Sequence, residues 1–204
     1  MLEPSIPRAA TAPGTYHPLS IGAHWLTLAL LAAIYALIEM RGIFPKSSDA
    51  HQLMKTWHNM LGLTVFGLVF VRLALRAVYP APSIDPPPPA WQDTLARAMH
   101  WALYAFLLVM PLLGWMLLSA KGKPIPWFGL ELPALMAPDR STAKALEEIH
   151  EVIGVLGYGL IGVHAAAALW HHYAMRDDTL HHMWPPARPR PPAGSAPRVA
   201  HEPE

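Results

Sequence analysis

Four long apolar segments without charged residues constrain this chain more than any other feature of its sequence. They cover residues 19–38, 56–71, 98–120 and 152–175. A helix rises about 1.5 Å per residue, so about 20 residues cross the hydrocarbon core of a bilayer. The second segment is shorter and becomes a span if Lys55, Arg72 and Arg76 reach the interface. A soluble bundle would keep a charged face on each helix, which these segments lack. The sequence therefore predicts an all-α, integral membrane four-helix bundle.

Proline-rich stretches mark the edges of this bundle. We expect a flexible N-terminal lead over residues 1–17, a four-helix transmembrane domain over 18–184, and a proline-rich disordered tail over 185–204. The lead lacks the features of a cleaved signal peptide. The formal net charge of +1 gives no support to nucleic-acid binding. We instead expect membrane lipid to surround the four-helix domain.

The residues available for chemistry inside the membrane are mainly histidines. The chain has 12 histidines and no cysteine. The lack of cysteine excludes disulfides, thiolate metal sites, iron–sulfur clusters and covalently attached c-type haem. Imidazole is therefore the main ligand left for a transition metal or a haem.

The spacing of the membrane histidines predicts two pairs. His150 and His164 are fourteen residues apart, which places them within about 40° of one helix face and about 21 Å apart along the axis. With antiparallel helices, His58 matches the depth of His150, and His24 matches that of His164. Such facing pairs suit two six-coordinate haems between the helices, which favours electron transfer because no iron position stays open. Each histidine taken alone could instead be a hydrogen-bonded packing residue.

Three other polar residues have two interpretations each. Arg72 follows His58 by fourteen residues, so it either faces haem propionates near the depth of His24 or extends to the interface. His171, with His172 beside it, hydrogen-bonds a quinone, carries protons near the terminal side, or lies at the interface. We expect His100 to lack a partner at its depth and to contact quinone or the interface. The remaining histidines, His17, His51, His181, His182 and His201, are expected in loops or the tail.

Several sequence stretches resemble the bacterial cytochrome b561 family of four-helix, dihaem membrane cytochromes. They are residues 20–26 (SIGAHWL), 39–45 (EMRGIFP), 71–76 (VRLALR), 126–129 (PWFG) and 156–173 (LGYGLIGVHAAAALWHHY). The resemblance covers roughly residues 15–184. It implies two non-covalent b-type haems held by His24, His58, His150 and His164. It also implies a location in the bacterial inner membrane with cytoplasmic termini. The positive-inside rule does not decide this orientation, because four spans place eight basic residues on the side of the termini and seven on the other side.

The family resemblance also implies an oxidoreductase. Some members are described as superoxide oxidases, which take an electron from superoxide outside and reduce membrane ubiquinone. Arg41, Lys121 and Lys123 are candidates for attracting the anion, although a solvated loop surface explains them equally well. The alternative is an electron-transfer subunit that relays electrons between quinone and a partner dehydrogenase or reductase. A haem-free transporter or metal carrier is a third hypothesis.

Overall fold

The computed structural model describes residues 14–184, and its main elements are four long helices. These are α1 (Pro18–Met40), α2 (Asp49–Val78), α3 (Ala90–Ala120) and α4 (Arg140–Trp170). All four are long and apolar enough to cross a membrane. The predicted all-α membrane bundle is therefore confirmed. Most of the predicted lead and the whole predicted tail lie outside the described residues.

Short elements follow or connect the helices. The 3-10 helix η1 (Arg41–Ile43) follows α1, and the antiparallel strands β1 (Pro126–Trp127) and β2 (Leu130–Glu131) lie between α3 and α4. The π-helix η2 (His171–Met175) extends α4, and the 3-10 helix η3 (His181–Met183) comes after it. These elements lie at the two ends of the bundle, next to its functional residues.

Side-chain caps fix where three helices begin. Ser48 accepts a hydrogen bond from the backbone N–H of His51 at the start of α2, and Asp139 accepts one from Thr142 at the start of α4. Such caps satisfy N–H groups that have no partner inside the helix. Hydrogen bonds from Ser141 and Thr142 lower the pKa of Asp139 to about 2. His17 caps α1 and stacks on Tyr79, with ring centres 3.8 Å apart.

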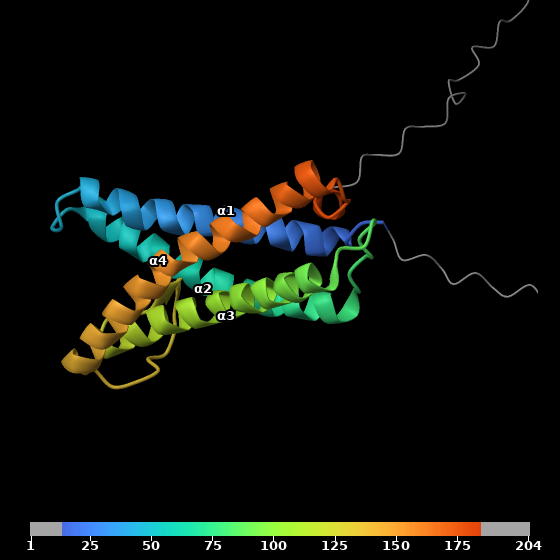
Figure 1. Cartoon of the computed structure of the whole chain (residues 1–204). Coiled ribbons are helices and arrows are strands. Elements are labelled where there is room, and N and C mark those ends of the chain that lie inside the picture. The colour runs from blue at the N-terminus through green and yellow to red at the C-terminus, as the bar shows by residue number, and fades with distance from the viewer. Residues whose placement is uncertain (1–13, 185–204) are drawn as a thin grey trace, which may run out of the picture.

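The helices are antiparallel along the chain, and α4 runs obliquely across the others (Figure 1). Helix α1 packs against α2, α2 against α3, and α3 against α4. Both ends of the described chain and the α2–α3 connection lie at one end of the bundle, here called the terminal end. The α1–α2 and α3–α4 connections lie at the other end, here called the loop end. This places the two ends of the bundle toward opposite faces of a membrane.

An apolar core fills the centre of the bundle. Its buried residues are Val65 and Val69 of α2 with Phe106 and Leu107 of α3. Gly157 of α4 makes this packing possible, because a Cβ added there would lie 2.5 Å and 2.7 Å from ring atoms of Phe106. Many large apolar side chains elsewhere are exposed, as expected for helices whose outer faces meet lipid.

The α3–α4 connection folds back onto the bundle at the loop end. The indole N–H of Trp127 donates to the hydroxyl of Thr64 in α2 over 3.2 Å, and that of Trp115 donates to the carbonyl of Pro133 over 2.9 Å. Ile125 is only 2% exposed. The connection is therefore an ordered cover and not a loose loop.

Two histidine pairs inside the bundle

The first pair of facing histidines lies toward the loop end. The ring centres of His58 in α2 and His150 in α4 are 6.3 Å apart. The ring nitrogen Nδ1 of His58 lies 3.1 Å from the carbonyl oxygen of Ile34, so the protonated Nδ1 donates and Nε2 is left unprotonated. Nδ1 of His150 is buried without a hydrogen-bond partner among the described residues. Both rings thus have a nitrogen available for a further ligand.

The second pair lies toward the terminal end. The ring centres of His24 in α1 and His164 in α4 are also 6.3 Å apart. Nη2 of Arg72 lies 3.3 Å from Nδ1 of His24, and its guanidinium carbon lies 5.7 Å from the ring centre of Tyr104. The predicted depth of Arg72 is therefore right, and its side chain points toward the histidine pair.

One expectation for this end was wrong. His100 does have a neighbour at its depth, because its ring centre lies 5.8 Å from that of His164. The apolar segment suggested a helix beginning near residue 98, whereas α3 begins at Ala90. His100 therefore lies about 15 Å from the start of α3, at the depth of His164 in α4.

The dimensions of both pairs fit an iron held between two imidazoles. A metal–imidazole bond of about 2 Å and roughly 1.1 Å from nitrogen to ring centre give ring centres about 6 Å apart. Both pairs are 6.3 Å apart, as such an iron requires. A Cβ added to Gly62, one turn beyond His58, would meet no atom within 4 Å, so the backbone there can accept a flat macrocycle. The residues present thus fit two bis-histidine haems.

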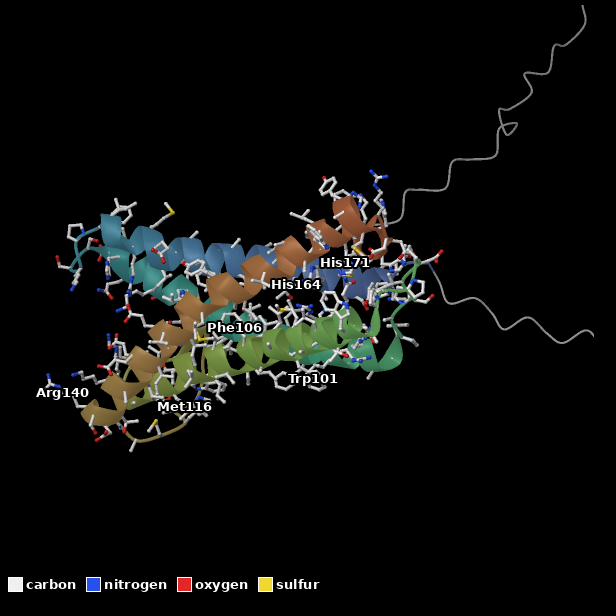
Figure 2. All side chains as sticks on the ribbon, viewed as in Figure 1. Trp101, Phe106, Met116, Arg140, His164 and His171 are labelled. Atoms are coloured by element: carbon white, nitrogen blue, oxygen red, sulfur yellow. The ribbon has the colours of Figure 1, made fainter. Side chains whose placement is uncertain are left out.

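His171 lies beyond the second pair, at the terminal end of α4 (Figure 2). Its Nδ1 is 2.5 Å from Oδ2 of Asp177, a carboxylate that is 6% exposed. Burial raises the pKa of Asp177, but hydrogen bonds from His171 and Thr179 outweigh burial, so this pKa lies below its usual range. A charged carboxylate therefore holds the His171 ring in a fixed orientation.

Two histidines that we expected in loops or the tail are buried instead. His51 lies in the first turn of α2, and its Nδ1 is 3.0 Å from the carbonyl oxygen of Arg41. His182 is 3% exposed, and its Nε2 is 2.9 Å from Oδ2 of Asp178. The contact between His182 and Asp178 could have been predicted from the sequence, because the two residues are four positions apart.

Basic side chains gather near the pair at the loop end. Arg41, Lys121 and Lys123 are all within electrostatic reach of Lys55, which precedes His58 by one turn. Glu147 pairs with Lys121 at 2.7 Å and so offsets one of these charges. The three candidates for attracting an anion, Arg41, Lys121 and Lys123, thus lie in one group around Lys55.

Four membrane-crossing helices with two facing histidine pairs define the class of four-helix membrane cytochromes. The chain belongs to the prokaryotic cytochrome b561 family, whose model matches residues 15–186. It is similar to "Cytochrome b561 homolog 1" of Escherichia coli (strain K12), with 43% identity over 162 residues, 79% of this chain and 92% of the relative. It is also similar to "Probable superoxide oxidase CybB" of Yersinia pestis, with 35% identity over 173 residues, 85% of this chain and 97% of the relative.

Proposed function

We propose that this cytochrome oxidises superoxide at the outer face of the bacterial inner membrane and reduces ubiquinone at the cytoplasmic face. Membership of the cytochrome b561 family establishes membrane electron transfer, and one relative is described as a probable superoxide oxidase. The observation that most supports the proposal is a pair of facing histidines in each half of the bundle. In this proposal, the terminal end is cytoplasmic and the loop end faces outward.

His58 with His150 and His24 with His164 would each hold one non-covalent haem b. When bound, haem b supplies reversible one-electron chemistry at a bis-histidine iron. The backbone carbonyl of Ile34 accepts from Nδ1–H of His58 and so leaves Nε2 unprotonated and able to bind a metal. The guanidinium of Arg72 places a positive charge at the other site, where its fork matches the propionate carboxylates.

The basic group at the loop end supports superoxide as the donor. Superoxide is an anion, and Arg41, Lys55, Lys121 and Lys123 raise its local concentration beside the outer pair. The ordered α3–α4 connection covers part of this end, because Trp127 is bonded to Thr64. In this proposal the basic residues attract the anion, and the α3–α4 connection limits its path to the outer pair.

His171 supports the terminal end as the place of quinone reduction. It follows His164 by seven residues on α4, about 10 Å along the axis. Asp177 accepts from Nδ1–H of His171, so Nε2 would accept from a quinol hydroxyl in the neutral ring and would donate to a quinone carbonyl oxygen in the cationic ring. This end would therefore bind the acceptor close to the inner pair.

Stopped-flow spectroscopy of the purified, oxidised cytochrome tests this proposal. Superoxide should reduce the b-type haem within the mixing experiment, and added ubiquinone should reoxidise it. No reduction by superoxide, or reduction without turnover of quinone, would contradict the proposal. Copurification of a dehydrogenase that alone reduces the haem would favour the relay subunit instead.

A further inference from the structure

Three imidazole rings meet at the inner site, whereas the outer site has two. The ring centre of His164 in α4 lies 6.3 Å from that of His24 in α1 and 5.8 Å from that of His100 in α3. His24 and His100 are also within electrostatic reach of one another. Within residues 14–184, the rings of His58 and His150 contact each other and no third histidine ring. The inner site therefore offers His164 two possible partners.

The face of α3 that carries His100 is turned toward this site. Tyr104 follows His100 by four residues and so lies on the same face of the helix. The guanidinium of Arg72 lies over the Tyr104 ring, and its Nη2 is 3.3 Å from Nδ1 of His24. Helix α3 also packs directly against α4, which carries His164. The packing of α3 thus keeps His100 beside the inner pair.

The separation of the His100 and His164 rings suits an iron as well as that of the inner pair does. Two imidazoles on one iron have ring centres about 6 Å apart. The value is 5.8 Å for His100 with His164 and 6.3 Å for His24 with His164. A haem held by His100 and His164 would therefore also be six-coordinate, with two histidine ligands.

Hydrogen bonding occupies His24 but not His100. A guanidinium only donates, so Nδ1 of His24 accepts from Arg72 and the proton of the neutral ring lies on Nε2. Binding of iron at this Nε2 requires the proton on Nδ1 and Arg72 turned elsewhere, as in a contact with propionates. The side chain of His100 is exposed, and its ring makes no hydrogen bond to the described part of the chain. The ring of His100 is therefore able to turn either nitrogen toward a metal.

We propose that His100 is a second axial partner for His164 and holds the inner haem when His24 does not. This inference rests on the proposed haem ligands. The inner haem then has one constant ligand, His164, and two exchangeable ones, His24 and His100. The exchange breaks one iron–imidazole bond and forms another, so it changes neither the charge of the iron nor its coordination number.

Replacing the exchangeable histidines singly and together separates their roles. His24→Ala leaves His100 as the only exchangeable ligand, and the double variant with His100→Ala leaves none. His58→Ala is the matched control, because the outer pair has no third ring beside it. The full-length proteins are purified from haem-replete cells, and haem is measured against protein. Electron paramagnetic resonance of the oxidised proteins distinguishes low-spin, bis-histidine haem from high-spin haem with one histidine.

We expect His24→Ala, and also the bulkier His24→Leu, to keep about two low-spin haems per chain. His100→Ala alone should also keep about two, while the double variant and His58→Ala should each keep about one.

Fewer than two haems in both His24 variants, or a high-spin second haem, would overturn the role of His100. A double variant that keeps two haems would overturn it as well. Two haems in His58→Ala, or a wild-type protein without a b-type Soret band, would refute the proposed ligands, and this inference with them.

Discussion

Replacement of Gly157 should disturb the apolar core between the two histidine pairs. This glycine lies seven residues from His150 and seven from His164. In Gly157→Ala the new Cβ would lie 2.5 Å and 2.7 Å from the ring of Phe106 and against the hydroxyl of Tyr35. Overpacking costs about 1–3 kcal/mol. Displacement of Tyr35 from the carbonyl of Gly154 costs about 1 kcal/mol more.

Gly159→Ala is the matched control, because a Cβ at Gly159 would meet no atom within 4 Å. Both changes gain the same helix propensity, about 1 kcal/mol, so their difference isolates the packing. We expect Gly157→Ala to be about 2–4 kcal/mol less stable than Gly159→Ala. Unfolding of both haem-loaded proteins by a denaturing detergent measures this difference from the Soret band. A difference below about 0.5 kcal/mol would refute the close packing of Phe106 against α4.

Three further predictions concern charges. Replacing Lys123 with Gln should slow haem reduction by superoxide severalfold at low ionic strength and much less at high ionic strength. Stopped flow measures both rates. Equal slowing at the two ionic strengths would contradict attraction of superoxide by the basic group. Arg72→Gln should lower the midpoint potential of one haem on the order of tens of millivolts, and a redox titration with both potentials unchanged would argue against its place beside that haem. The pKa of Asp139 falls from 3.8 to about 2 on folding, so its cap should stabilise the fold above about pH 4 and lose this contribution as pH falls toward 2. Asp139→Asn should flatten that part of the stability profile, and thermal unfolding between pH 5 and pH 2 checks it.

The pairing of the membrane histidines could be predicted from the sequence because it depends only on the helix repeat and on the antiparallel order of the helices. The helix repeat fixes the shared face of His150 and His164, and antiparallel order fixes the depths of His24 and His58. The structure brings both pairs to the same ring separation. The depth of Arg72 follows from the same helix repeat, since it is fourteen residues from His58.

Contacts that depend on the angle between helices could not be predicted in this way. His100 meets His164 because α4 crosses the bundle obliquely and because α3 begins well before its apolar stretch. The contact of Trp127 with Thr64 joins residues 63 positions apart, and no helix repeat encodes it. The contact of His171 with Asp177 depends on a π-helix and a left-handed residue, which hydrophobic periodicity does not detect.

The haem content of the chain tests the central claim most directly. We expect two haem b per chain in the wild type, measured as haem against protein after purification from haem-replete cells. His150→Ala and His164→Ala should each keep about one haem, because each histidine belongs to a different pair. A wild-type protein without a b-type Soret band, or two variants that both keep two haems, would contradict the proposed ligands.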